Sequence, residues 1–138
     1  MARVVIDANV MVSAVFGGIP LEAVSRALAK HEVYFSDSII RELEATILKL
    51  SSKLSQEQIL FVQEQIEQLV SMGEKISIFY HVTLSRDPKD DHYLSLCKKV
   101  KADFLITGDK DLLSISPENL RKHGIPTSIM TPRSFLEI

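Results

Sequence analysis

Acidic residues that could form a metal site recur at four places in this chain of 138 residues. Crowded carboxylates repel one another and resist ionising together, so a fold that gathers them needs something to offset their charge. A hard divalent cation does this, and Mg²⁺ or Mn²⁺ prefers oxygen ligands. Such an ion can lower the pKa of bound water and stabilise charge on a phosphoryl group. The four places are Asp7, Glu42, the pair Asp90 and Asp91, and Asp109.

Each of these acids also has an ordinary structural explanation. Asp7 follows an apolar run and precedes a helix-like segment, so it could simply cap that helix. Glu42 lies about 60° outside the apolar stripe of its predicted helix, where a solvated side chain is as reasonable as one that reaches over a sheet edge. Helical spacing directs Asp90 toward the apolar face of the following helix and Asp91 to the edge of that face. Asp87 competes with both for a place in the site.

Other catalytic chemistries find no support in the sequence. It contains no Walker loop, and no glycine-rich dinucleotide turn follows the first strand. No nucleophile–base–orienter set is apparent. The histidines are scattered and do not have the spacing of zinc ligands. They are His31, His81, His92 and His123.

The elements that must position the acids alternate between strand and helix patterns. Val4, Val5 and Ile6 are β-branched and apolar, which suits a strand buried on both faces. The alternation predicts a three-layer α/β/α fold with a parallel sheet of about five strands, in one domain of residues 1–138. The predicted strands are 4–6, 32–35, 74–80, 104–106 and 127–130, and helices are predicted from near residues 10, 20, 38, 55, 90, 112, 116 and 132.

This topology could bring the acids together. In a parallel sheet all the carboxyl ends of the strands lie on one edge, and open α/β sheets bind ligands there. Asp7 and Asp109 each follow a buried strand, and the helices that carry Glu42 and Asp91 begin on the same side. We therefore expect four separate segments to deliver carboxylates to a single cleft.

Composition and charge place the chain among ordinary globular proteins, with 46% hydrophobic and 25% charged residues. The net charge of −2 gives no overall basic field for nucleic acid, although a local basic patch beside the acids is compatible with it. The single cysteine, Cys97, lies on an apolar helical stripe, so we expect it in the core of a protein from a reducing compartment. No apolar run approaches the ~20 residues of a membrane span, and the first strand begins too early for a signal peptide. These features predict a cytoplasmic protein without a membrane partner.

Four motifs, in this order, resemble those of a PIN domain. The resemblance covers essentially the whole chain and extends to the prokaryotic PIN proteins regarded as toxins of toxin–antitoxin systems, related to VapC-type toxins. It implies the strand order 3-2-1-4-5, which places the strands before Asp7 and Asp109 side by side. The motifs are Ile-Asp-Ala-Asn-Val at 6–10, Glu42 in a helix after Ser38, Arg-Asp-Pro-Lys-Asp-Asp-His-Tyr-Leu at 86–94, and Thr-Gly-Asp-Lys-Asp-Leu-Leu at 107–113.

The resemblance also implies roles for individual residues. The catalytic acidic quartet falls on Asp7, Glu42, Asp91 and Asp109, with the metal on Asp7, Asp91 and Asp109. The supporting polar residues fall on Asn9 and Thr107, with Asp111 as an added acid. Asp87 and Asp90 become outer acids or caps. Cations beside the acids could bind substrate phosphates, although ordinary exposed charges explain each of them at least as well; they are Arg86, Lys89 and Lys110.

The function implied by the resemblance is an Mg²⁺- or Mn²⁺-dependent endoribonuclease that cuts single-stranded RNA, as the toxin of a toxin–antitoxin pair. Its expected partners are RNA, a cognate antitoxin protein and a second copy of the chain, bound through residues 10–30. The number of metals stays open, and either Glu42 or Asp109 could orient the attacking water.

Two rival functions are weaker. A metal-dependent phosphatase or phosphotransferase of the haloacid-dehalogenase type would need an aspartate where this chain has Asn9. A PIN fold retained only to bind RNA or protein would not need an intact acid set. Metal binding distinguishes this last alternative from the nuclease.

Overall fold

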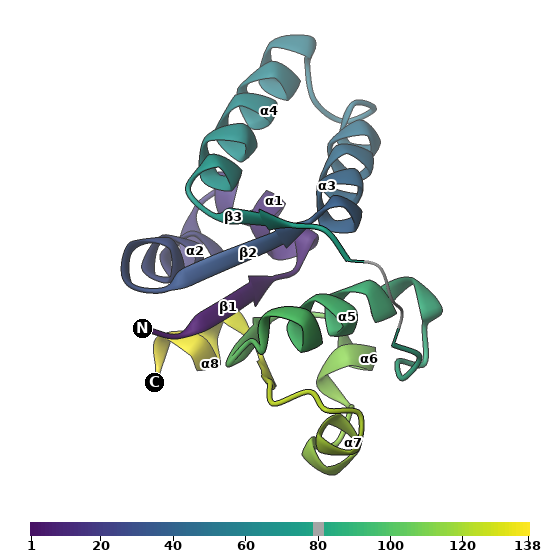
Figure 1. Ribbon diagram of the computed structural model, residues 1–138. Coiled ribbons are helices and arrows are strands. Elements are labelled where there is room, and N and C mark those ends of the chain that lie inside the picture. The colour runs from purple at the N-terminus through teal and green to yellow at the C-terminus, as the bar shows by residue number, and fades with distance from the viewer. Residues whose placement is uncertain (79–81) are drawn as a thin grey trace.

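A five-stranded parallel sheet forms the centre of the computed structural model, which describes residues 1–78 and 82–138 (Figure 1). Its strand order, β3-β2-β1-β4-β5, and its parallel pairing confirm the predicted fold and topology. In Figure 1, α5 crosses the near face of the sheet, while α1 and α2 lie behind it. The strands are β1 (Arg3–Ile6), β2 (Glu32–Ser36), β3 (Glu74–Ile76), β4 (Phe104–Ile106) and β5 (Ser128–Met130).

The helices follow the predicted order, with small shifts at their ends. The first begins at Ala8 rather than Val10 because the Asp7 side chain accepts a hydrogen bond from the Asn9 amide and caps it. The helices are α1 (Ala8–Val15), α2 (Gly18–Lys30), α3 (Asp37–Leu50), α4 (Gln56–Ser71), α5 (Asp91–Val100), α6 (Lys110–Leu113), α7 (Pro117–Lys122) and α8 (Pro132–Leu136), with a short 3₁₀ turn, η1 (Pro88–Asp90), before α5.

The third strand is shorter than predicted. It was expected over 74–80, but β3 ends at Ile76, and the last two residues of the predicted strand lie outside the described residues. The reason is its partner: β3 pairs only with β2, whose last three residues oppose it. Since β2 ends at Ser36, where α3 begins, a longer β3 would have no neighbour for its backbone hydrogen bonds.

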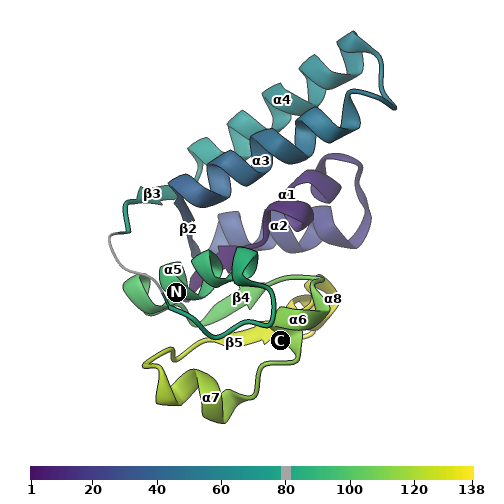
Figure 2. The same ribbon diagram turned by 90° about the vertical axis from the view of Figure 1, so that its right-hand side faces the viewer.

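Helices α3 and α4 form a hairpin between β2 and β3, and Figure 2 shows them projecting together away from the sheet. A capping box begins α4, because the side chains of Ser55 and Gln58 each accept a hydrogen bond from the other residue's backbone amide. This capping box fixes the start of α4 at Gln56.

The core lies against both faces of β1, whose residues Val4, Val5 and Ile6 are all fully buried. Cys97 is also fully buried, as predicted from its apolar stripe. Among the described helices, none is both long and apolar enough to cross a membrane alone; α1 and α2 reach that length only as a pair, bent by 111°. Because β1 is the central, buried strand, the residue that follows it is held firmly in place.

Candidate metal centre

Asp7 lies at the carboxyl end of β1 and is almost fully buried, with 4% of its surface exposed. Its backbone amide donates to the carbonyl of Ile106 at 2.9 Å, which extends the pairing of β1 with β4 up to the acid itself. The carboxylate accepts the Asn9 amide at 2.9 Å. Asp7 therefore does cap α1, and the same carboxylate lines an open cleft of about 370 Å³ that Asp109 also lines.

Thr107 joins the ends of the two central strands. Its hydroxyl donates to Asp7 Oδ2 at 2.6 Å and accepts the backbone amide of Asp109 at 3.0 Å. Burial raises the pKa of Asp7, against the lowering effect of hydrogen bonds from Thr107, Asn9 and Tyr93. The neighbouring negative charge of Glu42 raises it further. Asp7 and Asp109, far apart in sequence, are thus held at one edge of the sheet.

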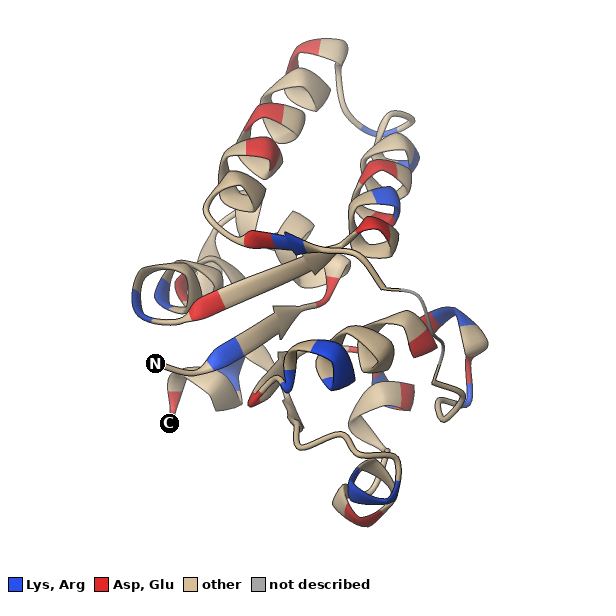
Figure 3. Cartoon of the chain, viewed as in Figure 1, with Lys and Arg blue, Asp and Glu red and all other residues tan. Residues whose placement is uncertain are grey.

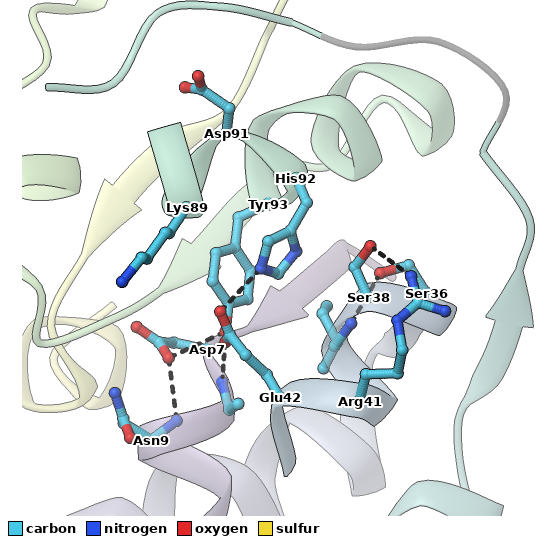
Figure 4. A network of polar contacts seen from close by, with 12 residues as sticks. Asp7, Asn9, Ser36, Ser38, Arg41, Glu42, Lys89, Asp91, His92 and Tyr93 are labelled. Carbon is cyan, nitrogen blue, oxygen red and sulfur yellow. Dashed lines mark hydrogen bonds and ion pairs between the residues drawn. The ribbon is translucent and has the colours of Figure 1, made fainter. Parts of the chain in front are cut away.

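Glu42 reaches from α3 across to α5, rather than into solvent. Its Oε1 lies 3.0 Å from His92 Nε2, and its Oε2 accepts a short hydrogen bond from the Tyr93 hydroxyl (Figure 4). Burial opposes ionisation of Glu42, but the hydrogen bonds from His92 and Tyr93, together with the charges of His92 and Lys49, outweigh it, so the pKa of Glu42 is lowered. Both oxygens of this carboxylate already have partners.

Two residues of this network are absent from the sequence-based site. Tyr93 was named only as part of the motif at 86–94, and His92 was also counted among the scattered histidines. Tyr93 is 1% exposed, and its hydroxyl contacts Glu42, Asp7 and the Ala8 amide. The only signal in the sequence is a hydroxyl-bearing ring at a buried position, and such a group usually finds a partner.

A second group of acids adjoins this network. One carboxylate oxygen from each of Asp90, Asp109 and Asp111 lies within 4.8 Å of the others. Asp90 Oδ2 is buried and has no hydrogen-bond partner among the described residues. Burial, together with the negative charges of Asp109, Asp87 and Asp7, raises the pKa of Asp90 to about 7. An unpaired carboxylate oxygen among acids is the environment that a hard divalent cation would complete, so the residues present fit Mg²⁺ or Mn²⁺.

Asp91 faces another direction. Its Oδ1 accepts the amides of Ser85 at 2.7 Å and Leu84 at 3.2 Å, which anchors the loop before η1. In Figure 4 its carboxylate points away from Asp7 and Glu42. Asp87 caps η1 by accepting the Lys89 amide at 3.0 Å. The geometry thus favours Asp90 over Asp91 beside Asp109, and the choice of metal ligand between them stays a prediction.

The predicted cations are exposed to solvent. Arg86, Lys89 and Lys110 are all exposed, and acidic and basic positions follow one another along the segment that leads into α5 (Figure 3). In Figure 4 the Lys89 side chain extends on the Asp7 side of the network. The Asn9 residue contributes its backbone amide to Asp7 and lines the same cleft.

The raised pKa of Asp90 predicts that the thermal stability of the protein depends on pH. A carboxyl group whose pKa rises on folding favours the folded state while protonated, so its contribution is lost as pH increases from about 4 to about 7. In EDTA, the melting temperature should therefore be higher at pH 5 than at pH 8, and Asp90→Asn should reduce that difference. Adding Mg²⁺ at pH 8 should restore stability.

Thermal melts followed by circular dichroism measure this effect. Glu64→Gln removes a carboxylate from the exposed surface of α4 and is the matched control. An Asp90→Asn protein with the same pH dependence as the wild type and the Glu64→Gln control would contradict the crowding of acids around Asp90.

Comparison with known proteins provides independent information. A family model described as a PIN domain matches residues 3–111. An uncharacterized protein from Methanocaldococcus jannaschii is 31% identical over 146 residues, which cover 98% of this chain and 90% of that protein. The family-model match, over residues 3–111, contains all the acids of the candidate site.

Two solved structures share the fold. A chain in the crystal structure of VapBC2 from Rickettsia felis, bound to a DNA fragment from their promoter, matches with a TM-score of 0.60 at 13% identity, covering 92% of this chain and 98% of that one. A domain of a functionally unknown protein from Methanocaldococcus jannaschii matches with a TM-score of 0.54 at 15% identity, covering 94% and 91%. At these identities the likeness concerns the fold alone.

Proposed function

This chain belongs to the PIN-domain family, and on that basis we propose that it is a metal-dependent endoribonuclease. The observation that carries the proposal is the gathering of acids from distant segments at the carboxyl edge of the sheet. Asp7 and Asp109 are linked through Thr107, and Asp109 lies with Asp90 and Asp111. A fold that crowds carboxylates next to an open cleft is suited to a cation and a phosphodiester.

The proposed metal ligands are Asp7, Asp109 and one acid at the start of α5. Asp90 suits the role of third ligand better, because its carboxylate lies with those of Asp109 and Asp111. The family pattern favoured Asp91 instead. A bound Mg²⁺ or Mn²⁺ would lower the pKa of a water and stabilise charge on the phosphate. One or two ions would be compatible with this donor set.

The protein's own groups have distinct tasks in this mechanism. Thr107, the Asn9 amide and Tyr93 orient the Asp7 carboxylate. Both oxygens of Glu42 have partners in α5, which supports Asp109 rather than Glu42 as the acid that orients the attacking water. Asp109 Oδ1 already accepts the amides of Asp111 and Leu112, so its other oxygen is the one that can face the reaction.

Single-stranded RNA is the proposed substrate. The cleft beside Asp7 and Asp109, of about 370 Å³, lies in the range of small-ligand pockets, and a flexible strand can present one phosphodiester there. Exposed cations at the rim, Arg86, Lys89 and Lys110, would contact flanking phosphates.

A toxin role and a cytoplasmic location complete the proposal. They are supported by the shared fold with a chain of VapBC2, a complex described with DNA from its promoter. A cognate antitoxin would be the protein partner. Growth arrest on induced expression in a bacterial host would support the toxin role, and no arrest would count against it.

A homodimer is proposed through the surface of residues 10–30. In that segment Phe16 is 62% exposed and Leu21 is 40% exposed, and large exposed apolar side chains often mark partner sites. We expect a dimer mass by light scattering at tens of micromolar protein, converted toward monomer by Phe16→Glu. A monomeric wild-type mass would exclude this interface.

The direct test of the proposed function is cleavage of single-stranded RNA by the purified protein. Cleavage should require Mg²⁺ or Mn²⁺ and stop when EDTA is added. Absence of measurable metal binding by calorimetry, together with no cleavage of varied RNAs, would favour a non-catalytic module instead.

A further inference from the structure

The Tyr93 hydroxyl occupies an unusual position between two acids of the site. It lies 3.2 Å from Asp7 Oδ1 and donates a short hydrogen bond to Glu42 Oε2. It also accepts the backbone amide of Ala8 at 2.9 Å. One phenolic oxygen on α5 therefore contacts the end of β1, the first residue of α1 and a side chain of α3, as Figure 4 shows for the acids.

A phenol has one hydroxyl proton, which limits the hydrogen bonds that the Tyr93 oxygen can donate. A neutral hydroxyl carries a single proton, so it can donate fully to only one carboxylate at a time. Tyr93 therefore lies between Asp7 and Glu42, donates its proton in the short hydrogen bond to Glu42 and contacts Asp7 at the longer distance.

The surroundings leave the hydroxyl little freedom to move. The ring is 1% exposed and packs against the His92 ring with a centroid distance of 4.1 Å. His92 is in turn bound to the other oxygen of Glu42 at 3.0 Å. Glu42 is thus held by two adjacent residues of α5, and the orientation of Asp7 depends on the same helix.

We propose that Tyr93 is a positioning residue of the metal site, which orients Asp7 against Glu42 and thereby raises the affinity of the site for a divalent cation. This inference rests on the proposed function, since it assumes that Asp7 binds the metal. Groups that orient metal ligands typically contribute about tenfold or more to metal affinity. A purely structural tyrosine, which only satisfies the Ala8 amide, would have no such effect in the folded protein.

The chain offers a matched control. Tyr34 also donates to a glutamate, Glu32, at 2.7 Å, and is 8% exposed. Glu32 lies at the start of β2, at the opposite end of the strand from the acids. Tyr93→Phe and Tyr34→Phe thus each remove a hydroxyl that donates to a glutamate, one inside the proposed site and one outside it.

Calorimetric titration with Mg²⁺ measures the effect on affinity. Tyr93→Phe should raise the Kd by about tenfold, whereas Tyr34→Phe should change it by less than about twofold. Circular dichroism must show that both variants are folded. An unchanged Kd in folded Tyr93→Phe overturns the inference and leaves the proposed function standing. A wild-type protein that binds neither Mg²⁺ nor Mn²⁺ overturns both.

A spectroscopic measurement on the unaltered protein keeps the inference testable if Tyr93→Phe does not fold. The chain has three tyrosines and no tryptophan, so its intrinsic emission is that of tyrosine. The emission of a phenol depends on the charges next to its hydroxyl, and a cation on Asp7 would change the charge beside the Tyr93 hydroxyl. Mg²⁺ should change the emission saturably in the wild type and in Tyr34→Phe, at the affinity found by calorimetry. Calorimetric binding without any change in emission would overturn the role of Tyr93.

Discussion

Asp7→Asn is expected to lose RNA cleavage by about a thousandfold while remaining folded, a loss of about 4 kcal/mol of transition-state stabilisation. Asp7 is 4% exposed, and its carboxylate is oriented by Asn9, Thr107 and Tyr93. An asparagine of the same shape retains one acceptor oxygen but removes the charge that would hold the cation. Initial rates on a labelled single-stranded RNA, with Mg²⁺ or Mn²⁺ in excess, measure the effect.

The fold of this variant should survive because the replaced charge is itself unfavourable. Burial and the charge of Glu42 both raise the pKa of Asp7, so the neutral amide relieves a repulsion in metal-free buffer. Circular dichroism and melting in EDTA should therefore show wild-type stability or slightly more. Glu64→Gln is the control for a lost acid elsewhere. Wild-type activity in Asp7→Asn would point to a contaminating ribonuclease and remove the evidence for this site.

The cleavage rate of the Asp90→Asn protein is expected to be at least about tenfold lower than that of the Asp91→Asn protein. Asp90 lies with Asp109 and Asp111 and has a buried oxygen without a partner among the described residues. Asp91 instead accepts the amides of Leu84 and Ser85. Its loss should act mainly through the loop before η1, and so should lower the melting temperature more than the loss of Asp90.

The two variants control for one another, since they are adjacent and carry the same change. Rates and melting temperatures should be measured together on both. If Asp91→Asn abolishes cleavage and leaves stability unchanged, the ranking implied by the family pattern holds, and the Asp91 carboxylate must turn toward the metal when it binds.

The fold was predictable because its signals are local and redundant. The β-branched run before Asp7 and the repeated strand–helix alternation predict a parallel sheet, and a resemblance to one family supplied its strand order. The length of β3 was not predictable from its own alternation, because it depends on where β2 stops. Strand length at a sheet edge is a property of the neighbour as much as of the segment.

The candidate site was predictable only in part, for a related reason. The residue types after β1 and β4 indicated carboxylates at one edge, and Thr107 does join them. Whether Asp90 or Asp91 faces Asp109 depends on the exact turn at η1, which the sequence does not specify. The contacts of Tyr93 could not be predicted from the sequence, because they depend on how α5 packs beside Asp7 and Glu42. These three segments are far apart in the sequence.

The hydrogen bonds by which Thr107 links Asp7 to Asp109 have a consequence for the folding of the protein during its synthesis. Asp7 is synthesised 100 residues before Thr107, so the acid is made long before the residue that links it to Asp109. The Thr107 amide itself donates to the carbonyl of Met130, which is synthesised later still. Chains emerge from the amino end and long-range strand pairs form late. A growing polypeptide therefore has no assembled acidic centre until the residues up to Met130 have left the ribosome, so the proposed nuclease site forms late in synthesis.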